Sequence, residues 1–193
     1  MLRWLPLALA LLSKPPGTEI ERVVAVVDKE VITQSALLTE ARVALVWREG
    51  ERAANTDITE ELFQAFRDYV VDQTLVAIQV RRLGSVEVSD EEIDQRAWQF
   101  SQRFTSMSAY HAFLRRHGIT ESVVRDILSR DLRNDRYITQ RMRTRLLGGA
   151  RGSPAGNSGY GEALKTWIRE LRLGAELRLL GPDGDLELQG RTF

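Results

Sequence analysis

Few side chains in this chain of 193 residues have the types and spacing that catalysis or metal binding requires. The chain has no cysteine, which excludes thiol catalysis, disulfides and cysteine-ligated metals. His111 and His117 are six residues apart, a spacing that places them on different faces of a helix, so we expect surface or interfacial histidines. No local motif supports a nucleophile, and no nucleotide-binding loop is present. We therefore expect no catalytic residue, no metal and no cofactor.

One group of carboxylates lies close enough together to suggest acid–base chemistry. Asp90, Glu91, Glu92 and Asp94 are the candidates for such paired carboxylates. They also follow Ser89 directly, and a serine followed by acidic residues is a common helix start. Helix capping is therefore the preferred interpretation of this group.

The aromatic side chains favour a binding function instead. Core packing is the default for any single aromatic residue, yet a few short helices cannot easily bury all of them. Large apolar side chains that remain on a groove can hold unfolded polypeptide segments. The candidate client-binding residues are Trp47, Trp98, Phe100, Phe104, Tyr110 and Phe113.

The charge balance gives no support to a nucleic-acid partner. The chain carries 27 basic and 27 acidic residues, so no net field attracts it to nucleic acid or to an anionic membrane. Arg141, Arg143 and Arg145 form a local basic run that could engage an acidic partner or lipid head groups. Cations near the C-terminal end of a helix are also favoured by the helix dipole, so the run has a structural interpretation too.

The N-terminus predicts export. Arg3 is followed by an apolar run from Trp4 to Leu12, which resembles a short secretory signal and is too short to span a bilayer. We assign residues 1–16 to a predicted signal sequence. The expected location is the periplasm, without stable insertion into a membrane.

A mainly α-helical body must position these side chains. The predicted helix around which this body is organised begins at Glu60 and ends before Gly84. Its apolar residues recur at spacings of three to five, which places most of them on one side of a helix. Asp57 and Glu60 form a capping-box pattern, and Gly84 is the residue type that commonly follows a helix end. This helix is long enough to organise the other elements.

Other predicted elements precede and follow this helix. The β-branched residues at 21–27 and 30–33 predict a tight hairpin, and Ser35 is the expected cap of a helix that ends near Gly50. A loop is expected from residue 49 to residue 56, because this stretch is polar and has no period. The remaining predicted helices span about 90–103, 109–117 and 121–147.

The C-terminal part follows a Gly-rich linker at 148–161. A helix at 162–173 and two strands at 175–180 and 186–189 are too small to bury themselves, as is the N-terminal hairpin. We therefore expect both chain ends to form one small antiparallel sheet beside the helices. Because the linker is long, a domain-swapped dimer stays an open alternative.

Three stretches resemble the N-terminal chaperone domain of SurA-type periplasmic proteins. They are VVAVVDKEVITQS at 23–35, with Asp28 where the family usually shows Asn, the string from QTLVAIQVRRLG to VSDEEID at 73–94, and FLRRHGIT at 113–120 with Arg125 beyond it. The resemblance covers nearly all of the chain after the predicted signal. It implies a chaperone domain at 19–147 that residues 162–193 complete, with the linker in place of the parvulin isomerase domains.

The resemblance implies an ATP-independent periplasmic chaperone, a holdase that binds unfolded outer-membrane or secreted proteins and has no isomerase activity. The alternative is an envelope adaptor or structural protein that reuses the fold to bind one dedicated partner. The first function predicts broad binding to unfolded chains, and the second predicts one tight partner.

Overall fold

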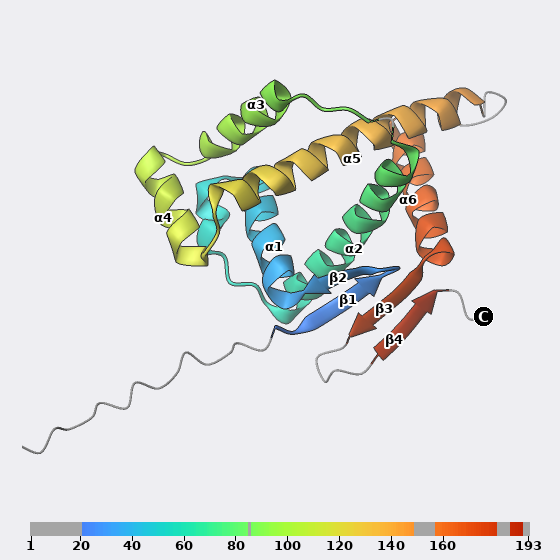
Figure 1. Ribbon diagram of the computed structural model, residues 1–193, viewed down its shortest axis with the longest axis horizontal. Helices are drawn as coiled ribbons and strands as arrows, with labels where there is room; N and C mark the ends of the chain where they lie inside the picture. Colours follow the sequence, from blue (N-terminus) through green and yellow to red (C-terminus); the bar gives the residue numbers. More distant parts are fainter. Residues whose placement is uncertain (1–20, 85, 149–156, 181–185, 191–193) are drawn as a thin grey trace, which may run out of the picture.

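Helices make up most of the chain (Figure 1). The computed structural model describes residues 21–84, 86–148, 157–180 and 186–190. The predicted class, mainly α-helical with a small antiparallel sheet, is confirmed. The elements in chain order are β1 (Val23–Val27), β2 (Glu30–Thr33), α1 (Gln34–Glu49), the 3₁₀ helix η1 (Glu51–Asn55), α2 (Glu60–Leu83), α3 (Asp90–Ser101), α4 (Met107–His117), α5 (Glu121–Gly148), α6 (Asn157–Gly174), β3 (Glu176–Leu180) and β4 (Leu186–Gly190).

The two ends of the chain form one sheet, as the sequence predicts. Its strand order is β2-β1-β3-β4, and every neighbouring pair is antiparallel. Val26 of β1 lies opposite Val31 of β2 on one side and opposite Arg178 of β3 on the other. In the turn after β1, the carboxylate of Asp28 accepts a hydrogen bond of 2.9 Å from the backbone N–H of Glu176. This bond fastens the N-terminal hairpin to the start of β3.

The first core cluster lies between this sheet and the helices α1 and α2. Strand β3 alternates between buried and less buried residues, as expected for a sheet with one covered face, whereas β1 buries the adjacent residues Val24 and Ala25, where its register with β2 shifts. Val27, Leu37 and Leu179 are fully buried in this cluster. Helix α2 adds a row of apolar residues that consists of Phe66, Val70, Val71, Leu75 and Ile78. Burial of this row holds the long helix against the sheet.

The long helix begins at Glu60, as predicted, but its cap differs from the prediction. Thr59 is its N-cap, and the Thr59 hydroxyl accepts a hydrogen bond of 3.4 Å from the backbone N–H of Leu62. The predicted cap, Asp57, is wrong because it lies two residues before Thr59, which is the extended residue next to the first helical turn. The predicted end is confirmed, since Gly84 has the left-handed φ of 63° that closes many helices.

The acidic residues at the start of α3 take part in capping that helix and in ion pairs, in agreement with the interpretation that the sequence favours. Ser89 and Glu92 form a reciprocal capping box, with bonds of 3.3 and 3.0 Å between each side chain and the other residue's backbone N–H. Arg125 contacts both Asp90 and Asp94, while Arg136 contacts Glu92. These pairs attach α3 to α5.

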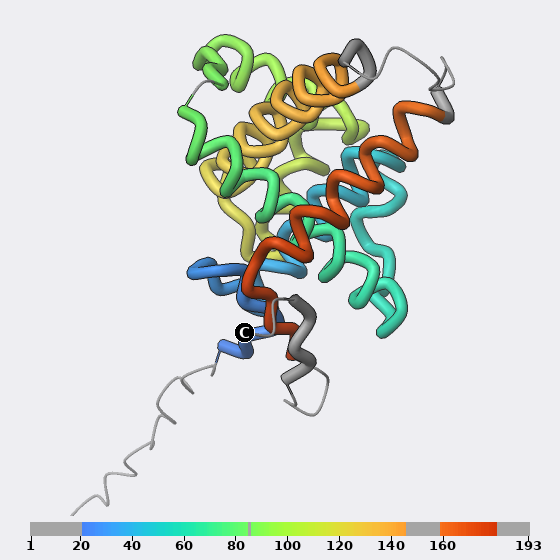
Figure 2. The backbone as a smooth tube through the Cα atoms, turned by 90° about the vertical axis from the view of Figure 1, so that its right-hand side faces the viewer, coloured from blue at the N-terminus to red at the C-terminus, as the bar shows by residue number. Residues whose placement is uncertain are grey.

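Helix α6 packs along α2 and α5, and Figure 2 shows it crossing the body as a diagonal rod. Trp167 of α6 is 3% exposed and lies in a third core cluster with Val76, Val80, Tyr137 and Met142. Its ring centroid is 5.8 Å from that of Tyr137 on α5. The C-terminal segment therefore completes the core of the helical body as well as the sheet.

Several predicted boundaries need correction. Helix α6 begins at Asn157, so the predicted linker 148–161 is too long at its C-terminal end. Thr33, not Ser35, caps α1, because the Thr33 hydroxyl reaches the N–H of Ala36 while Ser35 donates to Glu21. The expected loop after α1 contains η1. The predicted signal sequence, residues 149–156 and the turn at 181–184 lie outside the described residues.

Candidate functional site

Four of the six predicted client-binding residues belong to the core. Phe100, Phe104, Tyr110 and Phe113 are each between 0 and 7% exposed. They form an aromatic cluster in which Phe100 lies 5.8 Å from Phe104, 6.2 Å from Tyr110 and 6.4 Å from Phe113, measured between ring centroids. The prediction that these four line an open groove is wrong in this arrangement, because α3 and α4 fold against each other and against α1 and cover all four rings.

The other two predicted residues lie at the surface of the same region. The Trp98 side chain is 62% exposed, because it lies two residues before Phe100 on α3 and therefore points to the opposite side of the helix. Trp47 of α1 is half-buried, and its ring stacks on Phe100 with a centroid distance of 6.4 Å and an interplanar angle of 10°. Trp47 thus connects the aromatic cluster to the surface.

Trp47 also borders a cleft of the described structure. This cleft has a volume of about 320 Å³ and lies between α1, α2 and α5, with Arg96 of α3 at its edge. Its apolar wall consists of Val43, Ala44, Trp47, Leu62, Ala65, Phe66, Tyr69 and Leu128. The α2 residues in this wall are spaced by three, four and seven, so they form one stripe of the helix. Sequence periodicity identifies this stripe as buried, and it contains no signal that part of it faces a cleft.

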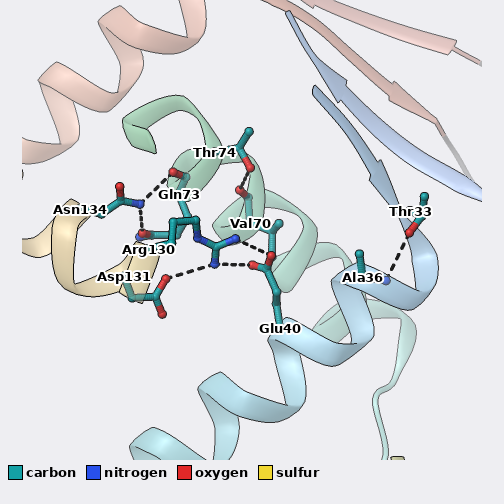
Figure 3. A network of polar contacts seen from close by, with 9 residues as sticks. All are labelled: Thr33, Ala36, Glu40, Val70, Gln73, Thr74, Arg130, Asp131 and Asn134. Carbon is teal, nitrogen blue, oxygen red and sulfur yellow. Dashed lines mark hydrogen bonds and ion pairs between the residues drawn. The ribbon is translucent and has the colours of Figure 1, made fainter. Parts of the chain in front are cut away.

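Polar side chains join α5 to α1 and to α2, as Figure 3 shows. Arg130 of α5 donates two hydrogen bonds of 2.6 and 2.8 Å to the Glu40 carboxylate of α1, and a third of 3.1 Å to Asp131. The side-chain amide of Asn134 donates to Gln73 of α2 at 3.0 and 2.8 Å. The two-bond contact between Arg130 and Glu40 has the fork geometry that makes arginine–carboxylate pairs strong.

Asp131 and Asp135 are one helical turn apart on α5 and line the cleft. Burial raises the pKa of Asp131 to about 6, and the nearby Arg130 guanidinium opposes this rise. Burial also raises the pKa of Asp135, against the effect of Arg96, which contacts it at 3.3 Å. Burial, followed by the charge of Asp131, raises the pKa of the Tyr69 hydroxyl above its usual range. The cleft is thus a site in which negative charge is poorly solvated.

The replacement Asp131→Asn is expected to change how stability depends on pH. The pKa of Asp131 is about 6 in the folded protein against 3.8 for an ordinary carboxyl, so the folded state binds more protons between these values. Wild-type stability therefore loses about 1–3 kcal/mol from this group as the pH rises through that window. The variant lacks this loss, so the difference in unfolding free energy, variant minus wild type, should grow between pH 4 and pH 7.

Urea denaturation at several pH values measures this difference. Asp126→Asn, an exposed site on the same helix, is the control and should stay within about 0.5 kcal/mol of wild type at every pH. A difference for Asp131→Asn that is constant across the pH range would show that the cleft does not raise the Asp131 pKa.

The remaining candidate groups have structural partners. The His117 ring nitrogen contacts the carbonyl oxygen of Ala54 at 3.0 Å, and burial lowers its pKa. His111 lies 3.6 Å from the Glu121 carboxylate. Among the described residues, no group of three or more histidine, aspartate or glutamate side chains could hold a metal ion. Within the same residues, no helix is long and apolar enough to cross a membrane.

Similarity to known proteins would offer a separate route to the function. No protein-family model matches the chain, and no curated protein matches its sequence. The resemblance to SurA-type chaperones therefore stays a hypothesis. The structural features that indicate a function are the cleft, the Trp47 side chain in its wall, the exposed Trp98 side chain nearby and the charges around them.

Proposed function

We propose that this protein is an ATP-independent chaperone of the periplasm that holds apolar segments of unfolded outer-membrane or secreted proteins in the cleft between α1, α2 and α5. We further propose that it has no isomerase activity and needs no cofactor. The observation that carries this proposal is the cleft itself, whose apolar wall includes a half-buried Trp47 and a 37% exposed Tyr69. Apolar surface that a folded chain leaves accessible is a common mark of a binding site.

The dimensions of the cleft support segment binding over binding of a folded domain. A volume of about 320 Å³ is at the lower end of the range for ligand pockets and accommodates one or two large side chains. Contact with so few side chains gives weak binding, since a fully buried apolar side chain contributes about 1.5–3 kcal/mol. Weak binding allows a client to leave without ATP hydrolysis, which is the behaviour expected of a holdase.

The chain topology also supports the proposal. In SurA-type proteins the C-terminal helix and strand return to complete the N-terminal domain, and here α6 and β3 pack on α2, α5 and β1. The resemblance implies that SurA-type proteins carry their isomerase domains at the position that corresponds to the connection between α5 and α6. The topology thus agrees with the one that the resemblance implies, and the aggregation test below separates the chaperone from an adaptor that reuses the same fold.

The test is suppression of aggregation. A urea-denatured porin is diluted into buffer without ATP, and light scattering is followed at several molar ratios of the purified protein. We expect dose-dependent suppression by the wild type. Tyr69→Ser removes apolar surface from the cleft and should raise the concentration needed for half suppression about 3- to 10-fold. Val31→Ser is the matched control, since Val31 is a 58% exposed apolar residue of β2 outside the cleft lining.

Two outcomes would contradict the proposal. If the folded wild-type protein does not suppress aggregation of any unfolded client, the dedicated-partner alternative becomes the better explanation. If Tyr69→Ser and Val31→Ser reduce suppression equally, the cleft is not the place where clients bind. Far-UV circular dichroism of each variant checks that its fold is unchanged.

A further inference from the structure

The charges around Trp47 are not balanced. The cleft and a neighbouring hollow lined by Trp47, Trp98, Gln99, Gln102 and Arg103 share the Trp47 side chain as their common wall. The charged residues that line these two depressions are Arg48, Arg96, Arg103, Asp131 and Asp135. Asp131 already contacts Arg130, and Asp135 contacts Arg96. Within the described residues, Arg48 and Arg103 therefore have no carboxylate partner.

Trp47 holds two of these arginines at the surface. The guanidinium carbon of Arg96 lies 4.8 Å from the Trp47 ring centroid, and that of Arg103 lies 5.2 Å from it. Such cation–π contacts use the face of the guanidinium and leave its N–H donors at the rim free to bind another group. Arg103 is exposed, so its donors face solvent beside the 62% exposed Trp98. Trp47, Trp98, Arg48 and Arg103 are named the tryptophan–arginine face below.

We propose that the tryptophan–arginine face selects clients in which an acidic residue is adjacent to a large apolar or aromatic residue. This inference deepens the proposed function and rests on it. The apolar side chain enters the cleft or the hollow beside Trp47, and the adjacent carboxylate accepts hydrogen bonds from Arg48 or Arg103. We infer an acidic client from charge complementarity. The cleft carboxylates of Asp131 and Asp135 already have arginine partners, whereas Arg48 and Arg103 have no carboxylate partner among the described residues.

A basic client residue fits this face less well. It would have to compete with Arg130 for Asp131 or with Arg96 for Asp135, and it would meet Arg48 and Arg103 at the margin. A neutral client would gain the apolar contacts alone. The expected order of affinity is therefore acidic, then neutral, then basic.

Fluorescence anisotropy with three labelled peptides tests this order. The peptides have the form Gly-Ser-Leu-Phe-Glu-Gly-Ser, with Gln or Lys in place of Glu in the second and third. We expect the Glu peptide to bind about 3- to 10-fold more tightly than the Gln peptide, as one or two exposed ion pairs allow. This ratio should shrink as salt rises from about 20 mM to about 300 mM, because exposed charges are screened.

Variants locate the effect. Arg103→Gln and Arg48→Gln should each lower the Glu-to-Gln affinity ratio, and the double variant should bring it close to one. Arg103→Lys should retain part of the preference because it keeps the charge. Arg143→Gln is the matched control, since Arg143 is an exposed arginine of α5 outside both depressions. A change in the fold would lower binding of all three peptides and would not move the ratio.

The possible results separate this inference from the proposed function. If the three peptides bind with equal affinity, or if the double variant keeps the preference, the acidic selectivity is overturned while the chaperone proposal stands. If no peptide binds and no unfolded client is protected from aggregation, both fail. A preference for the Lys peptide would show that Asp131 and Asp135 determine selectivity, which also overturns the inference.

Discussion

Replacing Phe100 with alanine is expected to lower the free energy of unfolding by about 3–5 kcal/mol, a cost typical of a buried phenylalanine. The Phe100 side chain is 0% exposed. Its ring is the central one of the aromatic cluster, with Trp47, Phe104, Tyr110 and Phe113 all within 6.4 Å between centroids. Because these neighbours come from α1, from α4 and from the connection between α3 and α4, the cavity cannot be filled by movement of one helix alone.

Urea denaturation followed by far-UV circular dichroism measures the loss. Trp98→Ala is the matched control, since it removes a larger ring from the same helix, and its stability should change by less than about 1 kcal/mol because Trp98 is 62% exposed. Equal losses of unfolding free energy for the two variants would contradict a helix α3 that buries Phe100 and exposes Trp98. A large loss for Trp98→Ala alone would mean that α3 is rotated about its axis.

Removal of residues 157–193 is expected to leave a chain that does not fold cooperatively. The deletion removes Trp167 from the third core cluster and Leu177 and Leu179 from the first. Each such loss costs about 2–5 kcal/mol, and the total stability of a typical domain is about 5–15 kcal/mol. The deletion also leaves β1 without its β3 partner and removes Arg172, which contacts Asp72 at 2.6 Å.

Size-exclusion chromatography and thermal unfolding test this prediction. The truncated chain should aggregate, and addition of residues 157–193 as a separate chain during refolding should restore soluble protein. A milder test is Trp167→Ala, which should cost about 3–5 kcal/mol, against Lys165→Ala on the exposed side of the same helix. A truncated chain that stays soluble and unfolds cooperatively would rule out a completing role for the C-terminal segment.

Local patterns determined the order and type of the elements. The hairpin at the N-terminus, the cap at Ser89 and the end of α2 at Gly84 agree with the structure, because each depends on residues that are close together in the sequence. The caps of α1 and α2 are each misplaced by two residues, between candidates whose side chains can all accept a backbone hydrogen bond, while the start of α2 at Glu60 agrees with the prediction. The return of the chain end to the N-terminal hairpin was predictable because neither piece can bury its apolar face alone.

The candidate site depended on tertiary packing. Trp98 and Phe100 are both aromatic residues of one helix, and only the position of α4 and α1 decides that Phe100 is buried while Trp98 is exposed. The pairing of Arg130 with Glu40 joins residues 90 positions apart, and the cleft wall combines residues of α1, α2 and α5. Burial and ion pairing between distant segments carry no local signal in the sequence. The sequence by itself therefore determined the helices, the strands and the shared sheet. The cleft and the arginines around it were decided by how those elements pack.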